Sequence, residues 1–231
     1  MILSKKKLSN LTKVETLEDI HSNKILEKNI SIPKIYFFNK GKYLKNKKFI
    51  INEIKKKFKA KFIIRSSSLS EDNVNYTNAG KFDSFVIQNF FDNEVRHKID
   101  IIISKFKNKN DQIFIQDYID NVDLSGVIFT REPSSNSPYY VINYDKSGFT
   151  NKITSGSYEK TAKTSITSKN KFYLNKKFIK LINLAQKLEN FYDCESLDIE
   201  FAKKGEKWFL FQCRKLPIRK PQIKDSAIFS S

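Results

Sequence analysis

The pattern of hydrophobic and polar positions predicts helices alternating with strands in the first half of the chain and mainly strands in the second. Apolar residues recur at helical spacing over about 13–28, 48–59, 95–106 and 176–191. Short apolar runs predict strands at 35–38, 62–64, 85–87, 113–118, 126–130, 139–144, 196–201 and 208–213. This mixture predicts an α+β fold. The polar run 107–111 is the expected boundary between subdomains 1–106 and 107–218, and residues 219–231 are the expected linker.

The first predicted helix carries a capping-box pattern, with Thr12 at its start and Glu15 three residues later. Lys13 then lies in the first turn, where a positive charge opposes the helix dipole. Such a lysine indicates an anionic group nearby. In a chain so rich in lysine, a solvated side chain is the alternative that composition favours.

An arginine and a group of serines follow the short apolar strand 62–64. Arg65 is expected where that strand ends, with hydroxyls behind it from Ser66, Ser67, Ser68 and Ser70. Small hydroxyl donors and a planar guanidinium suit anionic oxygens, so we interpret this stretch as a polyphosphate-binding loop. The alternative is a solvated serine-rich turn with the arginine in a surface ion pair.

The last two predicted strands form a candidate metal and phosphate site. Alternation places Asp198 and Glu200 on one face of the first strand, and Gln212 and Arg214 on one face of the second. Carboxylate and amide oxygens suit Mg²⁺, which also binds substrate phosphates, and the arginine would offset remaining phosphate charge. The alternative is the solvent-facing side of an ordinary hairpin.

This convergence depends on the turn. A three-residue turn at 204–206 pairs Glu200 with Leu210 and Asp198 with Gln212. A two-residue turn would reverse the parity, place both carboxylates opposite phenylalanines and destroy the site.

The charge of the chain invites a competing interpretation. A net charge of +18 raises the possibility of a basic nucleic-acid-binding module. The lysines are scattered along the whole sequence, however, so we expect no nucleic-acid partner. Only five of the 43 basic residues are arginines, which indicates that those positions need a rigid bidentate donor.

Other patterns narrow the class of protein. There is no P-loop, protein-kinase or dinucleotide-binding glycine motif, so phosphates must be held by side chains and scattered backbone amides. The two histidines are too few and too far apart for a zinc cluster or a serine–histidine–aspartate triad. The two cysteines show no metal-binding spacing, and no run resembles a signal peptide or a membrane span. A cytoplasmic protein with no membrane partner is expected.

Taken in order, five motifs resemble the ATP-grasp domain of the phosphoenolpyruvate synthase and pyruvate phosphate dikinase family over about residues 8–218. The motifs are 62–72 (FIIRSSSLSED), 78–84 (NAGKFDS), 126–133 (GVIFTREP), 197–202 (LDIEFA) and 210–214 (LFQCR). Segments 11–17 and 144–156 are most similar to dikinase-type proteins of capsular polysaccharide gene clusters, such as the L-glutamine kinases of capsule phosphoramidate biosynthesis.

The resemblance implies two subdomains whose antiparallel sheets enclose a nucleotide cleft. It also implies an enzyme that binds Mg-ATP and sends the β,γ-pyrophosphoryl group to a histidine on a swivelling domain of the same polypeptide, releasing AMP. The phosphate would end on a small acceptor bound elsewhere, such as the amide of L-glutamine. Neither His21 nor His97 has the small-residue surroundings of such a histidine, so this chain is expected to be only the ATP-binding domain. A non-catalytic nucleotide sensor is the further alternative.

The resemblance also implies residue roles. Arg65, Arg131 and Arg214 would be catalytic, with Arg131 at the phosphate end and Arg214 at the transferred group. Glu200 and Gln212 would hold Mg²⁺. The other nucleotide contacts are expected from Lys13 at the phosphates, from Gly80 and Ser84 in a closing loop, and from Gln116 with the backbone up to Tyr118 at the adenine.

Two positions depart from the family pattern. Residues 148–151 (GFTN) replace Gly-Leu-Gly-Glu, so an expected carboxylate is missing there. Lys215 replaces the usual proline after the Gln-x-Arg motif.

Overall fold

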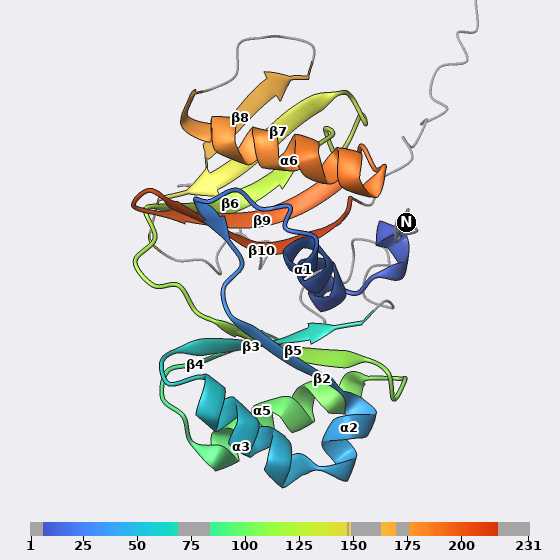
Figure 1. The fold of residues 1–231 in the computed structure, drawn as a ribbon, viewed down its shortest axis with the longest axis vertical. Helices are drawn as coiled ribbons and strands as arrows, with labels where there is room; N and C mark the ends of the chain where they lie inside the picture. Colours follow the sequence, from blue (N-terminus) through green and yellow to red (C-terminus); the bar gives the residue numbers. More distant parts are fainter. Residues whose placement is uncertain (1–6, 69–83, 147, 149–162, 170–175, 217–231) are drawn as a thin grey trace, which may run out of the picture.

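The strands form two sheets in the computed structural model, which describes residues 7–68, 84–146, 148, 163–169 and 176–216 (Figure 1). The small sheet has the order β2 (Ile35–Asn39), β5 (Gln112–Asp117), β3 (Phe62–Ser67), β4 (Ser84–Ile87). The large sheet has the order β1 (Ile30–Ser31), β10 (Lys207–Lys215), β9 (Leu197–Lys204), β6 (Leu124–Phe129), β7 (Tyr139–Asp145), β8 (Lys163–Ser168). Of these described pairs, β1 with β10 is parallel and the others are antiparallel. The α+β prediction is confirmed.

The described helices are α1 (Lys13–Ser22), α2 (Lys40–Lys45), α3 (Lys47–Lys57), α5 (Asp92–Lys105) and α6 (Ile179–Tyr192), with 3₁₀ turns at Leu8–Asn10 and Lys176–Phe178. Helices α2, α3 and α5 cover the outer face of the small sheet, α6 packs on the large sheet, and α1 lies between the two sheets (Figure 1). The capping box of the first predicted helix is present, but the helix ends at Ser22 and is therefore shorter than expected. Helix α2 was not predicted. No helix within the described residues combines the length and apolar character needed to cross a bilayer.

The small sheet buries one face against α2, α3 and α5. Alternate residues of its strands form this core with the apolar side of the helices: Phe38, Phe62, Ile64, Ile87, Ile113 and Ile115. Phe49 lies outside this core and is 56% exposed, because the inward side of α3 runs through Ile50, Ile51 and Ile54. The opposite face of the small sheet carries the intervening residues, including Arg65, Phe114 and Gln116.

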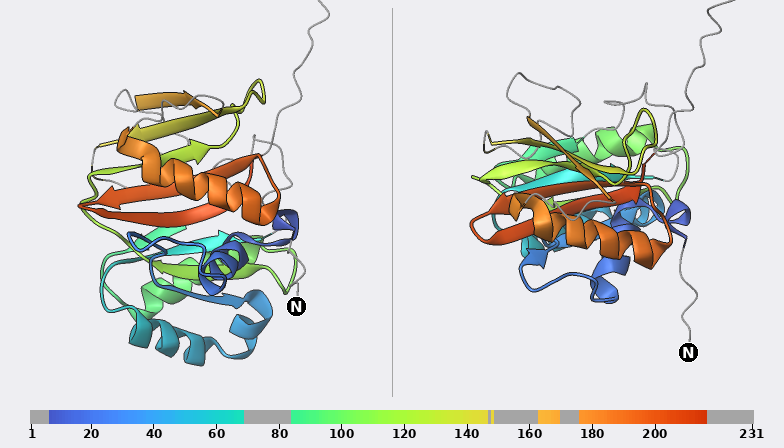
Figure 2. Two further views of the ribbon diagram at one scale, coloured as in Figure 1. Left: turned by 45° about the horizontal axis from the view of Figure 1, so that its top comes forward. Right: turned by 90° about the horizontal axis from the view of Figure 1, so that it is seen from above.

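The large sheet also buries one face. Helix α6 runs along that face of β9 and β10, which Figure 2 shows from two further directions. Helix α1 contributes Leu17 and Ile20 to the same core, and the Tyr192 hydroxyl donates to Asp19 Oδ2 at 3.2 Å. The other face of β9 carries the alternate residues Asp198 and Glu200, which leaves them available to face the small sheet.

The chain passes between the two sheets twice. It starts in the large sheet with β1, builds the whole small sheet, and returns to the large sheet with β6. The two crossings lie side by side, because Ile35 pairs with Gln116 and Asp117 N donates to Lys34 O at 3.0 Å. A division at residue 106 would therefore separate β5 from the sheet in which it pairs. Residues 219–231 lie outside the described part.

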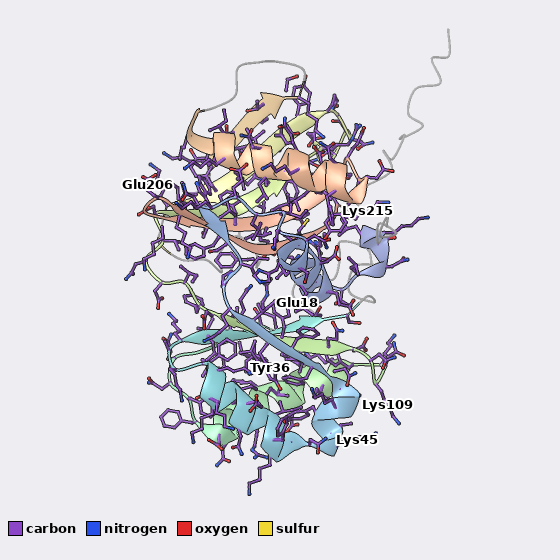
Figure 3. The ribbon with its side chains drawn as sticks, viewed as in Figure 1. Glu18, Tyr36, Lys45, Lys109, Glu206 and Lys215 are labelled. Atoms are coloured by element: carbon purple, nitrogen blue, oxygen red, sulfur yellow. The ribbon has the colours of Figure 1, made fainter. Side chains whose placement is uncertain are left out.

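The turn of the β9–β10 hairpin differs from the expected one. Lys204 pairs with Lys207, so Gly205 and Glu206 form a two-residue turn, and Gly205 has the positive φ of 58° that such turns favour. Glu206 is labelled at this tip in Figure 3. The prediction of a three-residue turn is wrong.

A β-bulge restores the arrangement that a two-residue turn alone would destroy. The register shifts by one at Phe211, so two residues of β10 oppose one residue of β9. The predicted cross-strand partners of both carboxylates are thus wrong, since Gln212 lies opposite Glu200 and Arg214 lies opposite Asp198. All four polar side chains nevertheless share one face, as the alternation predicted.

Candidate functional site

The two sheets meet at a contact between Arg65 and the β9–β10 hairpin. Arg65 Nη2 donates to Glu200 Oε2 and to Gln212 Oε1, each at 3.1 Å. The side chains of Arg65 and Glu200 are 14% and 11% exposed, and Gln212 is buried. Three residues predicted for one site are therefore in direct contact, although 135 and 147 positions separate Arg65 from its partners.

Arg65 lies within β3 and not at its end, which corrects the expected position. Its neighbours across the strands are Ser84 on β4 and Phe114 on β5. The guanidinium carbon lies 5.5 Å from the centre of the Phe114 ring, a distance at which a cation is attracted to the ring face. Ser84 is exposed at the start of β4 and lies on the same side of the sheet as Arg65. Gly80, the other residue of the predicted closing loop, is outside the described residues.

A second ion pair lies next to the first on the hairpin. Arg214 Nε and Nη2 donate to Asp198 Oδ2 at 2.9 and 2.8 Å, and Asp198 is 5% exposed. Burial raises the pKa of the neighbouring Cys213 thiol, and the Asp198 charge raises it further. The face thus carries two carboxylates, each held by an arginine.

Two of the buried serines have protein partners. Ser67 Oγ accepts from Val14 N at 3.1 Å, and Ser68 Oγ donates to Asp111 Oδ1 at 2.7 Å. Ser66 is buried as well, and Ser70 is outside the described residues. The interpretation of the serines as a polyphosphate-binding loop is therefore corrected at Ser67 and Ser68, whose hydroxyls connect elements of the fold.

The start of α1, with Lys13, lies against the small sheet. Thr12 caps the helix and donates its hydroxyl to Gln112 Oε1 at 2.7 Å, and Gln112 Nε2 donates to Glu15 Oε1 at 2.9 Å. Val14 N reaches Ser67, two positions beyond Arg65 on the same face of β3. Lys13 therefore begins its helix beside the strand that carries Arg65.

Gln116 lies on the Arg65 face of the small sheet and is 1% exposed. Its Nε2 has no hydrogen-bond acceptor among the described residues. A buried amide donor in that state is costly unless a further group accepts from it. Tyr118 is half-buried, with Lys61 Nζ 4.1 Å from the centre of its ring, and its backbone N donates to Lys61 O.

A small apolar cluster on the hairpin was not predicted as part of the site. Val122, Ala202, Phe209 and Phe211 are buried together, and the half-buried Ile119 packs against them. Ala202 follows Glu200 by two positions and so lies on the same face of β9. The sequence signal was the unbroken apolar run of residues 208–211, which an alternating strand with one polar face does not explain.

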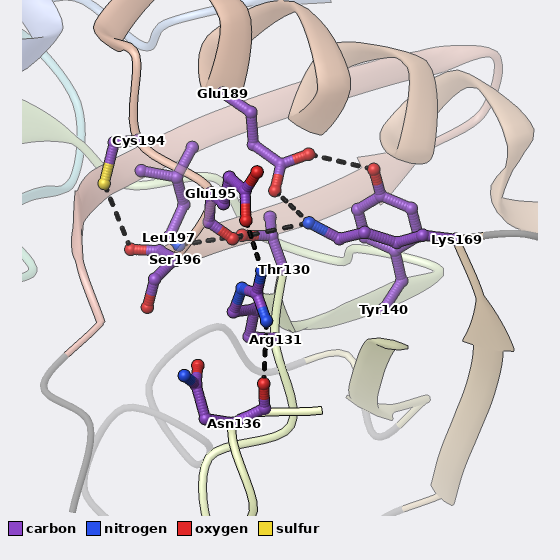
Figure 4. Close-up of polar contacts among 10 residues, drawn as sticks. All are labelled: Thr130, Arg131, Asn136, Tyr140, Lys169, Glu189, Cys194, Glu195, Ser196 and Leu197. Atoms are coloured by element: carbon purple, nitrogen blue, oxygen red, sulfur yellow. Dashed lines mark hydrogen bonds and ion pairs between the residues drawn. The ribbon is translucent and has the colours of Figure 1, made fainter. Parts of the chain in front are cut away.

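Arg131 belongs to a different set of contacts, drawn in Figure 4. It pairs with Glu195, and its Nη1 donates to Asn136 O at 2.8 Å. Glu195 is 73% exposed, and its contact with Arg131 lowers the pKa of its carboxyl. Neither of these contacts involves Arg65, Glu200 or Gln212.

Glu200 and Gln212 fit Mg²⁺ in the chemistry of their donors. Their side-chain oxygens are buried and converge on one nitrogen of Arg65, so they can also converge on a cation. Among the described residues, no group of three or more histidine, cysteine, aspartate or glutamate side chains gathers to hold a metal. Two side-chain oxygens from the described residues suit Mg²⁺, because it keeps waters and binds phosphates. Of the divergent segment 148–151, the structure describes only Gly148, with φ of 84°.

No protein-family model matches the chain, and no curated protein is detectably similar to it in sequence. Solved structures do match. D-alanyl-alanine synthetase A from Vibrio cholerae gives a TM-score of 0.52 at 12% identity, over 89% of this chain and 55% of that one. The D-alanine–D-alanine ligase from Coxiella burnetii gives a TM-score of 0.50 at 9% identity, over 89% of this chain and 47% of that one. A RimK domain ATP-grasp protein from Sphaerobacter thermophilus gives a TM-score of 0.47 at 10% identity, over 89% of this chain and 58% of that one.

The chain spans about half the length of these solved structures. At such low identity the likeness shows the fold alone. The predicted ATP-grasp fold, an α+β chain with antiparallel sheets, is confirmed.

Proposed function

We propose that this chain binds Mg-ATP between its two sheets as the nucleotide-binding domain of a dikinase-type phosphotransferase. The observation that carries the proposal is the contact of Arg65 with Glu200 and Gln212 across the two sheets. A guanidinium is suited to phosphate oxygens, and a carboxylate with an amide oxygen is suited to Mg²⁺. A metal–triphosphate complex needs both kinds of group within a few ångströms.

The polar residues of the site suit different parts of Mg-ATP. Lys13 and Arg65 would bind phosphate oxygens, and Arg214 would lie at the transferred group. Glu200 and Gln212 would hold Mg²⁺, which offsets phosphate charge when it is bound. Arg131 would serve the phosphate end only after exchanging its contacts with Glu195 and Asn136.

The purine base would bind where the linker after β5 approaches the hairpin. Gln116 has a buried amide donor without an acceptor among the described residues, and a base nitrogen can accept from it. The apolar cluster of Val122, Ala202, Phe209 and Phe211 supplies flat hydrophobic surface on the same side of β9 as Glu200. A planar aromatic base fits such a mixture of apolar wall and single polar contact.

The dikinase assignment rests on the order of the five motifs. In that reaction a histidine nitrogen of a separate swivelling domain attacks the β-phosphorus of ATP. The bond from that phosphorus to the α,β-bridging oxygen breaks, and AMP leaves. The histidine then carries a pyrophosphoryl group, and transfer of its terminal phosphoryl group to water or orthophosphate leaves phosphohistidine. The remaining phosphoryl group passes from the histidine to a small acceptor, for which the motifs favour the amide of L-glutamine in capsule modification.

Isothermal titration calorimetry of Mg-ATP into this chain tests nucleotide binding. Arg65→Ala should weaken the affinity about ten- to a hundred-fold, the loss expected for a charge-assisted hydrogen bond of about 1.5–3 kcal/mol. Lys48→Ala is the matched control, because it removes one positive charge from the exposed side of α3 and should leave the affinity unchanged. Equal affinity in wild type and Arg65→Ala would contradict the proposal.

The nucleotide product tests the reaction class. A polypeptide that joins this chain to its phosphohistidine domain should release AMP from ATP when L-glutamine is present. Phosphorus NMR distinguishes AMP from ADP directly. Accumulation of ADP would leave ATP binding intact and replace the dikinase with a phosphotransferase or ligase that cleaves at the γ-phosphate.

A further inference from the structure

One nitrogen of Arg65 bridges the two residues proposed to hold Mg²⁺. Nη2 lies 3.1 Å from Glu200 Oε2 and 3.1 Å from Gln212 Oε1. A single positively charged donor shared by a carboxylate and an amide oxygen occupies the position where a shared cation would lie. Both oxygens would have to exchange this donor for the metal.

The environment holds the guanidinium in this place. The side chain of Arg65 is 14% exposed, and its guanidinium carbon lies 5.5 Å from the centre of the Phe114 ring. The side chain of Glu200 is 11% exposed, and a carboxylate buried to that extent needs a positive partner. Arginine remains charged at any pH the protein experiences, so it supplies that partner continuously.

We infer that Arg65 is a resident counter-cation that keeps divalent metal out of the Glu200–Gln212 pair until a polyphosphate draws the arginine away. This inference rests on the proposed function and adds an order of binding to it. A bare divalent cation would have to bind beside a guanidinium at the same two oxygens, whereas the metal–nucleotide complex brings phosphate oxygens that accept from Arg65. The metal therefore enters with the nucleotide and not before it.

The distances support the same order. Mg²⁺ binds oxygen at about 2.1 Å, so a site now spread around a nitrogen at 3.1 Å must contract by roughly 1 Å for a metal to bind. Two protein oxygens give little affinity for a free ion that loses water reluctantly. Phosphate ligands supply the missing coordination only when nucleotide is present.

Mn²⁺ alone is the probe that tests this inference, because its free concentration can be followed by electron paramagnetic resonance without any turnover. Wild-type protein should bind Mn²⁺ weakly in the absence of nucleotide. Arg65→Ala should bind it about ten-fold or more tightly, although the same substitution weakens Mn-ATP binding. We therefore expect one substitution to raise the affinity for free Mn²⁺ and to lower the affinity for Mn-ATP.

Two further variants assign the effect. Arg65→Lys keeps the positive charge and should exclude free Mn²⁺ as the wild type does. The double variant Arg65→Ala with Glu200→Gln should lose the gained Mn²⁺ affinity. Circular dichroism spectra and melting curves identify any variant that is not folded, and the wild-type comparison of Mn²⁺ with Mn-ATP needs no variant.

Wild-type protein that binds free Mn²⁺ as tightly as Arg65→Ala would overturn the inference. Retention of the gained affinity after Glu200→Gln would overturn it as well, since the ion would then lie elsewhere. Failure of the wild type to bind Mn-ATP would instead remove the proposed function. The free-ion comparison between wild type and Arg65→Ala would remain readable in that case.

Discussion

Arginine is rare in this chain, and each described arginine on the large sheet or facing it is bonded to an acidic side chain. Arg65 bridges Glu200 and Gln212, Arg214 donates twice to Asp198, and Arg131 pairs with Glu195. Arg214 donates through two of its nitrogens, the geometry expected where arginine marks a position that needs a rigid bidentate donor. Where a lysine would serve, the composition of the chain favours lysine.

Arg214 and Arg131 should differ in their effect on stability. Arg214→Ala leaves the 5% exposed Asp198 without its double donor and should lower the free energy of unfolding by about 1–3 kcal/mol. Arg131→Ala breaks an ion pair whose carboxylate is 73% exposed and should cost clearly less, because water replaces the partner. Urea denaturation of the two variants measures the difference, and equal losses would contradict it.

Asp117, which follows Gln116 at the end of β5, should make stability depend on pH. Burial raises the pKa of its carboxyl, and Lys34 opposes that rise. The folded state therefore holds the proton more tightly than the unfolded state. The contribution to stability is fully present below the ordinary pKa of 3.8 and is lost as the pH rises through the raised value.

Asp117→Asn removes this ionisation and should stabilise the protein at pH 7 relative to wild type. The gain should disappear at about pH 3, where the wild-type carboxyl is protonated in both states. Urea midpoints at the two pH values measure it. A gain of equal size at both pH values would show that charge is not its cause.

For single residues, the sequence predicted that the side chains of one site lie together, but it did not predict the hydrogen-bond partners of the neighbouring serines. Arg65, Glu200 and Gln212 were placed together because each lies in a motif of fixed order. The roles of Ser67 and Ser68 were not predictable from their own stretch. Their partners Val14 and Asp111 lie about 50 positions away, and nothing local to the serines specifies them.

Among the elements, β6 depends most strictly on a single residue. A Cβ added at Gly126 would lie 2.2 Å from Asn143 O and 2.9 Å from Tyr144 Cα, both backbone atoms of the neighbouring strand. Gly126→Ala should therefore force β6 and β7 apart and lower the free energy of unfolding by about 1–3 kcal/mol or more. Chemical denaturation monitored by Trp208 fluorescence measures this change.

Gly41 is the matched control for that substitution. A Cβ there meets its nearest atom, Lys109 O, at an ordinary contact distance of 3.5 Å. Gly41 lies within α2, where alanine is favoured over glycine by about 0.5–1 kcal/mol. Gly41→Ala should be neutral or stabilising, and a loss matching that of Gly126→Ala would contradict the steric explanation.

The hairpin shows what a pattern at element scale can and cannot predict. Alternation correctly placed Asp198 and Glu200 on one face, because a strand has period two whatever its partner. The turn length and the bulge at Phe211 both escaped prediction. The two shifts add to two residues, which restores the parity, so the shared polar face was right although both predicted cross-strand partners were wrong.

For the whole molecule, the fold class was predictable and the path of the chain was not. Strand and helix patterns indicated an α+β chain, and the motifs indicated the ATP-grasp fold. The polar run 107–111 gave a clear local break, yet β5 beyond it completes the small sheet between β2 and β3. The boundary of a subdomain depends on which strands pair, and these strands can be far apart in the sequence. A local break in composition does not indicate that pairing.

The small sheet and its helices should fold as an isolated fragment. Their buried core draws only on residues between 36 and 115, whereas the core of the large sheet draws on residues up to 35 and from 124 onward. A fragment of residues 33–118 has its two ends paired in neighbouring strands. Dispersed amide resonances in a ¹H–¹⁵N spectrum and a cooperative melt are the expected result, and a random-coil spectrum would contradict it.

Because the chain enters and leaves the small sheet at one place, Arg65 and the proposed metal ligands Glu200 and Gln212 belong to units with separate cores. The phosphate recognition proposed for Arg65 and the cation recognition proposed for Glu200 and Gln212 would thus be half-sites that a protein chemist can isolate, titrate singly and recombine. Nucleotide that binds both fragments at once would hold them together. The affinity of the two fragments for each other in its presence would then measure how much binding free energy each half-site contributes.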